Sequence, residues 1–250
     1  MHTADALAFI KALTYREVVE GAATAASSGN VIELCYTSDL AWPWPREFTY
    51  RREYLAVAEA SEVAAVIDRK HEIVVNLFHP DVTSQEAMLL EAGLTRAWIN
   101  PIMGRDLAQP WPRTVPVSTG ACEVRSGDDR TRFNSMPGIS NRSDALDDRI
   151  HYLFFENDGQ VIAKGQLIYL GDQTAYISDL FTDPAFRRQG WCSSMMAVLE
   201  EQARSLGATR AVLAPGLEQL AIQLYERYGY SHTAERTVLI PSAQPDVRRS

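Results

Sequence analysis

Cysteine is scarce in this 250-residue sequence, which holds only Cys35, Cys122 and Cys192. The three are far apart, form no C-x-x-C pair and have no histidine at metal-ligand spacing, so neither a disulfide framework nor a metal site is predicted. Apolar runs are also short, and none approaches the ~18 residues that span a bilayer. The first residues lack the basic and apolar regions of a signal peptide. We therefore expect reduced thiols, no metal, no membrane partner and a cytoplasmic location.

Positive charge is in deficit, because 24 Lys and Arg face 32 Asp and Glu for a net charge of −8. This balance disfavours sequence-independent nucleic-acid binding, which depends on neutralising phosphates. It suits a cationic substrate, or it serves solubility alone. Walker and G-x-G-x-x-G motifs are absent, which removes the main support for P-loop and Rossmann folds. What remains, with 46% hydrophobic and 22% charged residues, is typical of a soluble globular protein.

Hydrophobic spacing predicts alternating helices and strands in the first part of the chain. Helices are expected over residues 4–27, 52–70 and 84–94, and strands over 31–37, 72–78 and 96–107. Residues 108–120 concentrate proline and small side chains, so we interpret them as a linker between residues 1–107 and 121–250.

The second part shows a sharper pattern. A short helix is expected over 143–152, then a hairpin over 150–170 with its turn at 157–159, strands over 174–182, 209–215 and 232–240, and helices over 190–206 and 217–228. The order after the linker is therefore hairpin, strand, helix, strand, helix, strand.

The stretch FRRQGWCSSM, residues 186–195, is a candidate anion site. It joins a strand to a helix, whose first N–H groups lack intrahelical partners and whose dipole is positive at that end. Gly190 permits close backbone approach, and Arg187 and Arg188 add charge. Alternatively, the arginines are solvated loop residues and the glycine is an incidental turn.

Two motifs resemble those of the GCN5-related N-acetyltransferases, or GNAT superfamily. LFTDPAFRRQGWC fits the family's acyl-CoA loop, Q/R-x-x-G-x-G/A, with Cys192 in place of the final Gly or Ala. EQLAIQLYERYGY fits the helix N-x-x-A-x-x-L-Y-x-x-x-G-F/Y, with Glu218 in place of Asn. Cys192 is expected to narrow the room beside the pyrophosphate, and Glu218 puts one polar contact to CoA in doubt. The resemblance covers roughly residues 120–240.

The resemblance implies an α/β (α+β) fold with a mixed, mostly antiparallel central sheet flanked by helices, and acetyl-CoA as co-substrate without a metal. It also implies that the strand SDLFT bulges and splays from AVLAP, which frees backbone groups to pair with pantetheine. The residues expected to bind the cofactor are Leu180, Phe181, Thr182, Arg187, Arg188, Gln189, Gly190, Trp191, Cys192, Ser193 and Glu218.

Tyr225 stands at the family's general-acid position and would protonate the leaving thiolate, or it only packs in the core. Asp179 is the candidate general base. It could instead pair with a cationic substrate or be a buried, hydrogen-bonded strand residue. Glu156 and His232 are weaker candidates for the base.

The first part resembles a degenerate second copy of the same fold. A shift of 136 positions places Arg51 and Arg52 on Arg187 and Arg188, VVNL on RAVL, and Gly93 on Gly229. In this register Tyr54 replaces Gly190 and Leu89 replaces Tyr225, which would remove cofactor binding and acid catalysis. A chance match is the alternative.

The resemblance thus implies an acyl-CoA-dependent N-acetyltransferase that acts on a primary amine, which we expect to be a small molecule. The alternatives are a non-catalytic acyl-CoA-binding regulatory module and a protein N-acetyltransferase. Acetyl-CoA and the amine are the expected partners, nucleic acid is not, and the chain is expected to be a monomer or homodimer.

Overall fold

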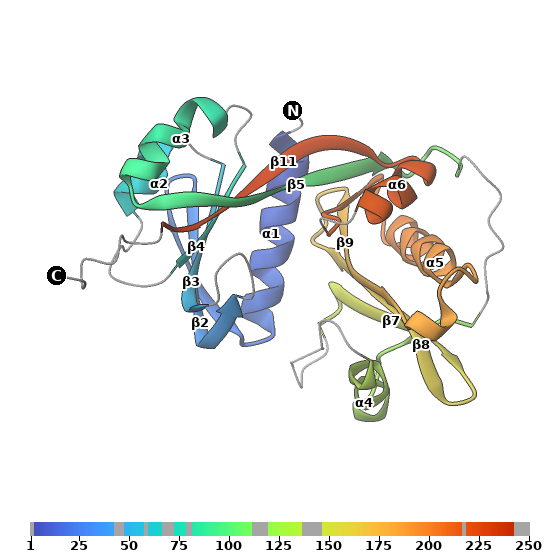
Figure 1. Ribbon diagram of the computed structural model, residues 1–250. Helices are drawn as coiled ribbons and strands as arrows, with labels where there is room; N and C mark the ends of the chain where they lie inside the picture. The colour runs from blue at the N-terminus through green and yellow to red at the C-terminus, as the bar shows by residue number, and fades with distance from the viewer. Residues whose placement is uncertain are drawn as a thin grey trace.

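The computed structural model describes residues 3–42, 48–57, 60–66, 73–78, 82–111, 120–136, 147–216 and 219–242. The elements fall into two lobes (Figure 1). The front lobe consists of α1 (Thr3–Val19), β1 (Ala23–Ser28), β2 (Val31–Trp42), β3 (Phe48–Ala56), α2 (Ala60–Val66), β4 (Ile73–Leu77), α3 (Val82–Glu91) and β5 (Leu94–Asp106). The back lobe consists of β6 (Cys122–Glu123), α4 (Gly127–Ser135), β7 (Ile150–Asn157), β8 (Gln160–Tyr169), β9 (Thr174–Thr182), a 3-10 turn (Pro184–Phe186), α5 (Trp191–Ser205), β10 (Arg210–Leu213), α6 (Gln219–Arg227) and β11 (Ser231–Pro241).

One 11-stranded sheet runs through both lobes in the order β1-β2-β3-β4-β11-β5-β10-β9-β8-β7-β6. Two pairs, β3 with β4 and β9 with β10, are parallel, and the other described pairs are antiparallel. The last strand of each lobe inserts into the other, since β5 lies between β10 and β11 while β11 lies between β4 and β5. Figure 1 shows these two long strands crossing the molecule. The lobes are therefore similar in strand order and joined by exchanged strands.

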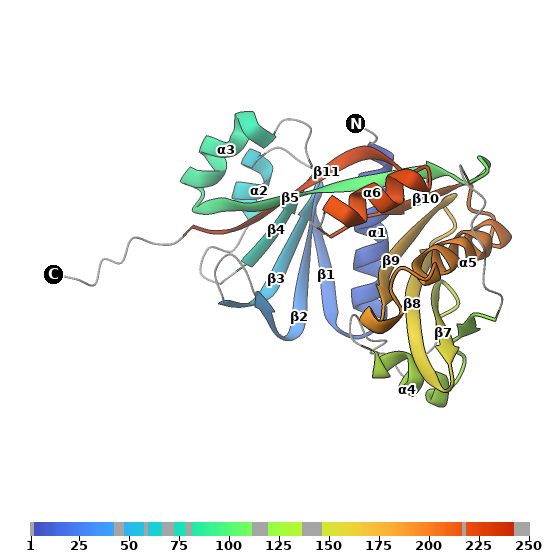
Figure 2. The ribbon, with the colours of Figure 1, turned by 45° about the vertical axis from the view of Figure 1, so that its right-hand side comes forward.

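Helix α1 packs between the lobes, as Figure 2 shows. The ring of Phe9 lies 5.4 Å from Phe78, which follows β4, and 5.2 Å from Tyr176 on β9. At the start of the helix, Asp5 accepts two hydrogen bonds from Arg210 of β10, each 2.6 Å long. Apolar burial and charge pairing thus fix α1 to both halves of the sheet. Within the described ranges, no helix has the length and apolar character needed to cross a bilayer.

Most of the elements expected in the second part are confirmed. The hairpin of β7 and β8, strands β9, β10 and β11, and helices α5 and α6 lie where the pattern placed them. The helix expected over 143–152 is wrong at its end, because Ile150 begins β7, and residues 141–146 lie outside the described part. The observed helix α4 lies earlier, where the hydroxyl of Ser126 caps it by accepting from the Asp129 N–H.

In the front lobe, two of the expected helices are wrong in extent. The helix expected over 4–27 ends at Val19, and small residues after Gly21 form β1. The helix expected over 52–70 is instead the end of β3 followed by α2. Four consecutive residues of β3, Glu53 to Ala56, are buried, so the strand has no period-two alternation. Strands β4 and β5 and helix α3 are confirmed.

The predicted linker, 108–120, falls largely outside the described part, since residues 112–119 are not described. The division into residues 1–107 and 121–250 stays a prediction. Because β5 and β11 exchange places, each range contributes one strand that pairs with strands of the other range.

A buried charged cluster ties α5 to β5. The Glu200 side chain is fully buried and accepts hydrogen bonds from Arg105 of β5, from the Trp111 indole at 2.7 Å and from Arg204 at 3.0 Å. Its other oxygen accepts from the Tyr230 hydroxyl at 3.0 Å. Three donors thus meet Oε2 of this carboxylate and one meets Oε1.

We expect Glu200→Ala to lower the free energy of unfolding by about 3–5 kcal/mol, because the Arg105 guanidinium is left buried without its counter-ion. Urea denaturation measures the loss. The control is Glu201→Ala, whose exposed carboxylate also pairs with Arg204, at 3.1 Å. That change should cost less than about 1 kcal/mol, and equal losses in both variants would contradict the expectation.

Candidate functional site

Strands β9 and β10 separate at the centre of the back lobe. They pair at only three positions and part after Tyr176 and Val212, whereas β9 continues to Thr182. On its other side β9 carries a bulge, where Asp179 and Leu180 together stand opposite Gly165 of β8. Asp179 has φ 56°, in the left-handed region. The bulge and splay expected for SDLFT are therefore confirmed, and the backbone of 180–182 is not paired to β10.

The glycine opposite the bulge is required by close packing. A Cβ at Gly165 would lie 2.8 Å from Leu199 of α5 and 3.0 Å from the side chain of Leu180. Helix α5 can thus pack directly on β8, which brings its first turn beside the end of β9.

The N-terminus of α5 presents unpaired backbone donors. Gly190 is its N-cap at φ 92° and supplies no side-chain cap. The first intrahelical bond runs from Ser194 N to Gly190 O at 2.9 Å. The N–H groups of residues 191–193 therefore have no partner within the helix, and the helix dipole makes this end electropositive.

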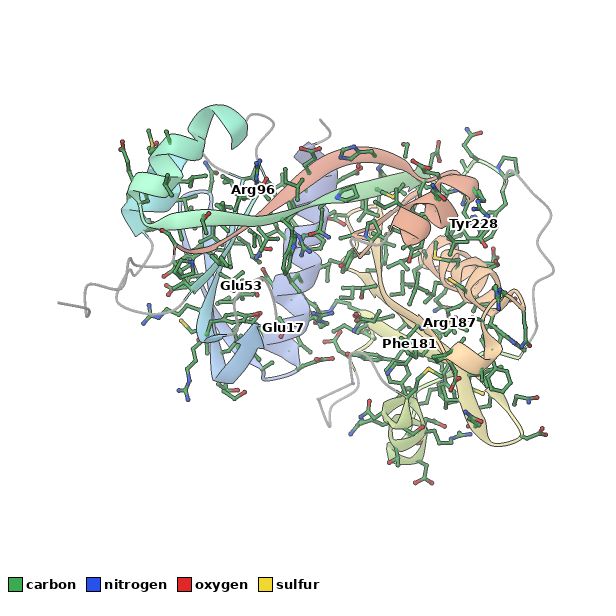
Figure 3. All side chains as sticks on the ribbon, viewed as in Figure 1. Glu17, Glu53, Arg96, Phe181, Arg187 and Tyr228 are labelled. Carbon is green, nitrogen blue, oxygen red and sulfur yellow. The ribbon has the colours of Figure 1, made fainter. Side chains whose placement is uncertain are left out.

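Two of the loop side chains take distinct positions. Arg187 folds back along β9, with its Nε donating to the Thr182 carbonyl at 3.2 Å and its guanidinium 5.9 Å from the Phe181 ring. Figure 3 shows Phe181 and Arg187 close together at this end of β9. Gln189 turns away and donates to the Ala185 carbonyl at 3.3 Å. The Arg187 guanidinium thus adds positive charge near the N-terminus of α5.

These features enclose one pocket of about 430 Å³ between β9, α5 and α6. All the residues expected to bind the cofactor line it except Gln189 and Glu218, and Glu218 lies outside the described residues. Phe186, Ala221 and Leu224 line it as well, and so does Tyr225. The volume lies within the range of ordinary small-molecule sites. The sequence motifs therefore converge on a single concave site.

Tyr225 enters the pocket from α6 beside Cys192. Burial, and then the nearby Cys192 thiol, raise the pKa of Tyr225 above its ordinary value, so the phenol stays protonated at neutral pH. Burial likewise raises the pKa of the Cys192 thiol to about 11, and the protein's three cysteines are free. The pocket thus contains a neutral hydroxyl donor and a thiol whose raised pKa keeps it protonated at neutral pH.

Asp179 lies behind this pocket and does not line it. Its carboxylate accepts from Arg16 of α1 at 3.2 Å and from the Ser178 hydroxyl at 3.2 Å. Burial raises the pKa of Asp179, against the opposing effect of Arg16. Sequence reasoning missed Arg16, because nothing near it in the chain indicates a partner 163 positions away.

The two weaker candidates for the base lie elsewhere. Glu156 pairs with Arg132 at 2.7 Å, and His232 is half exposed with Glu235 3.8 Å away. Neither residue lines the pocket.

The sequence profile of the acetyltransferase (GNAT) family matches residues 120–230. Residues 120–230 thus match the GNAT family. No curated protein matches the sequence significantly. Among solved structures, a GCN5-related N-acetyltransferase from Kribbella flavida superposes with a TM-score of 0.67 at 18% identity, covering 95% of this chain and 96% of that chain.

Two further structures also superpose on both lobes. A putative GNAT-family acetyltransferase from Novosphingobium aromaticivorans has a TM-score of 0.59 at 16% identity, covering 98% of this chain and 100% of its own. A tandem GNAT protein from the clavulanic acid biosynthesis pathway has a TM-score of 0.53 at 11% identity, covering 86% of this chain and 84% of its own. At these identities the likeness establishes the fold alone. The GNAT-like mixed sheet with a second, related N-terminal lobe is thereby confirmed.

The shift of 136 positions is correct only for part of the front lobe. It aligns β4 with β10, α3 with α6 and β5 with β11, which hold equivalent places in the sheet. Arg51 and Tyr54, however, lie inside β3 and not in a loop, and Tyr54 is buried. The register fails here because 16 residues separate β3 from β4, whereas 27 residues separate β9 from β10.

The parallel strands β3 and β4 of the front lobe stay paired up to their last residues. β3 and β4 pair at five positions up to Ala56 and Leu77, the last residues of both strands. The pairing extends further, since Phe78 N donates to Ala56 O at 2.8 Å. Leu89 of α3, at the place equivalent to Tyr225, is buried and apolar. Among the described residues of the front lobe, there is therefore neither a free strand edge between β3 and β4 nor a hydroxyl at the place equivalent to Tyr225.

Proposed function

We propose that the protein transfers an acetyl group from acetyl-CoA to a primary amine, and that the back-lobe pocket holds the acyl-CoA. The observation that carries this proposal is the separation of β9 from β10 directly beside the α5 N-terminus. A pantetheine chain, which carries amides, needs a strand edge with free N–H and C=O groups, and a pyrophosphate needs a cluster of donors. The pocket offers the two side by side, with the edge at 180–182 and the donors at 190–193.

In the proposed reaction the amine nitrogen attacks the thioester carbonyl, the C–S bond breaks, and the thiolate leaves. A backbone N–H of 180–182 stabilises the developing oxyanion. The Tyr225 hydroxyl donates its hydrogen bond, and then its proton, to the thiolate sulfur. The amine's surplus proton passes to water, and Asp179, the candidate base, takes it only through that water, because its carboxylate pairs with Arg16 and does not line the pocket.

The acceptor is proposed to be a small cationic amine, supported by the net charge of −8. A protein amino group is the alternative acceptor. The second candidate function, an acyl-CoA-binding module without turnover, is favoured by Cys192 in the loop and opposed by Tyr225 in the pocket.

The test of the proposed function is release of free thiol from acetyl-CoA by the purified protein with a panel of small amines and lysine peptides. Turnover with an amine supports acetyl transfer and excludes the alternative of an acyl-CoA-binding module without turnover. Tight acetyl-CoA binding in calorimetry without turnover on any amine would favour the binding module, and absence of binding would contradict both.

We expect acetyl-CoA to bind with a stoichiometry of one per chain. The front lobe keeps β3 and β4 paired to their ends, so it has no free strand edge between them for a second pantetheine. Isothermal titration calorimetry measures the stoichiometry. Two sites of similar affinity would contradict the interpretation of the front lobe as degenerate, while leaving the back-lobe pocket intact.

A further inference from the structure

Arg16 of α1 joins the two strands that form the bulge. Its Nη1 lies 3.2 Å from Asp179 Oδ2 on β9 and 3.3 Å from Gln166 Oε1 on β8. Its Nη2 lies 2.6 Å from Glu17 Oε1, the neighbouring carboxylate on α1. Arg16 and Gln166 are both buried. A front-lobe side chain thus bridges the bulged strand of the back lobe and its partner.

The backbone at this point needs such a restraint. Asp179 is in the left-handed region, which costs a residue with a Cβ roughly 1–2 kcal/mol. The Ser178 hydroxyl lies 2.7 Å from Gln166 Oε1 and 3.2 Å from Asp179 Oδ2. These bonds keep the Asp179 carboxylate turned away from the pocket toward α1. Leu180, the next residue, then faces the pocket.

The charge balance at the bulge depends on Arg16. Burial alone would lower the pKa of this guanidinium, but the carboxylates of Asp179 and Glu17 raise it above its ordinary value. Without Arg16, the Asp179 carboxylate would be a buried charge that has lost its hydrogen-bonded counter-ion. Such a group is stabilised by rotating toward solvent or by taking up a proton, and rotation would change the backbone at 179–180.

We propose that Arg16 is a positioning residue for acyl transfer, through which the front lobe holds the β9 bulge in the geometry that presents 180–182 to the acyl group. This proposal rests on the proposed function. It assigns the front lobe a part in the rate of the reaction beyond mechanical support. Arg16 acts through Asp179 and does not itself line the pocket.

Two other ion pairs join α1 to the back lobe and serve as matched controls. Asp5 pairs with Arg210 at 2.6 Å and is itself buried, and Lys11 pairs with Asp172 at 3.4 Å on the surface. Neither pair contacts the bulge or the pocket. Asp5→Asn thus removes a buried contact between the lobes, while Lys11→Met removes an exposed one.

The experiment compares Arg16→Met, Arg16→Lys, Asp5→Asn and Lys11→Met in kcat, acetyl-CoA Kd, stability in urea and amide exchange of peptides from β9. A misplaced reacting group costs up to about 10²-fold in rate. Arg16→Met should approach that loss in kcat and show faster exchange in β9, with a smaller rise in acetyl-CoA Kd, because 180–182 is also the edge proposed for the pantetheine. Arg16→Lys keeps the positive charge but loses the planar guanidinium that bonds two partners at once, so its kcat should lie between those of wild type and Arg16→Met. Asp5→Asn should lose stability yet keep wild-type kcat and β9 exchange, and Lys11→Met should match wild type throughout.

Wild-type kcat and β9 exchange in Arg16→Met would overturn the proposal, and so would losses matching those of Asp5→Asn in every readout. If Arg16→Met does not fold, Arg16→Lys decides the question. Wild-type kcat and wild-type β9 exchange in Arg16→Lys would equally overturn the proposal. Failure of the proposed function is distinguishable, because the wild-type protein would then turn over no amine. Exchange of β9 would still test whether Arg16 holds the bulge.

Discussion

Replacing Gly190 by glutamate should weaken acetyl-CoA binding by about 10²-fold or more, which corresponds to roughly 2.7 kcal/mol. Apart from its chain neighbours, no described residue lies within 4 Å of a Cβ built at this position, so the new side chain would project into the space proposed for the pyrophosphate. Its carboxylate would repel the phosphates and compete for the N–H groups at the start of α5. Isothermal titration calorimetry measures the loss.

Backbone strain accounts for only part of this effect, and a second variant separates it. Any side chain at φ 92° carries a cost of roughly 1–2 kcal/mol in folding stability. Gly190→Asn introduces a shorter, uncharged side chain, in a residue that tolerates this conformation. It should bind acetyl-CoA much better than Gly190→Glu does. If Gly190→Glu keeps wild-type affinity, the pyrophosphate does not bind at the α5 terminus.

Replacing Tyr225 by phenylalanine should lower kcat by about 10²-fold, the low end of the range for general acid catalysis, with little change in acetyl-CoA affinity. The hydroxyl would act only as the thiolate leaves, which is an interaction made in the transition state. Because burial raises its pKa, the Tyr225 hydroxyl is a weaker acid than an exposed phenol. Much of its contribution would then be hydrogen-bond donation to the sulfur.

A neighbouring tyrosine provides the control for Tyr225→Phe. Tyr230 lies 6.2 Å from the Tyr225 ring and donates to Glu200 at 3.0 Å, away from the pocket lining. Tyr230→Phe should cost about 1–3 kcal/mol of stability for the lost bond to a charged group and leave kcat unchanged. Steady-state kinetics at saturating amine compares the two. Unchanged kcat in Tyr225→Phe would mean that this ring only packs.

The part of the site that could be predicted from sequence is the part built by contiguous residues. The anion loop and the helix motif each lie within one short stretch, and the family resemblance that the two motifs carry placed Gly190 and Tyr225 in one site. The bulge at Asp179 was expected only from the family resemblance, since its local residues carry no glycine to indicate a left-handed conformation.

The rest depended on contacts between distant segments. Arg16 meets Asp179 only because α1 packs across the sheet of the other lobe, which no local pattern specifies. β3 was mistaken for a helix because it is buried on both faces and lacks alternation. The exchange of β5 and β11 was also unforeseen, because a strand's hydrophobic pattern fixes its face and not its neighbours.

The most direct measurement is a crystal structure of the protein grown with acetyl-CoA. We predict one acetyl-CoA per chain, with its pyrophosphate on the N–H groups of 190–193, its pantetheine along 180–182 and its thioester sulfur beside the Tyr225 hydroxyl. Acetyl-CoA bound between β3 and β4, or elsewhere with the back-lobe pocket empty, would contradict the account.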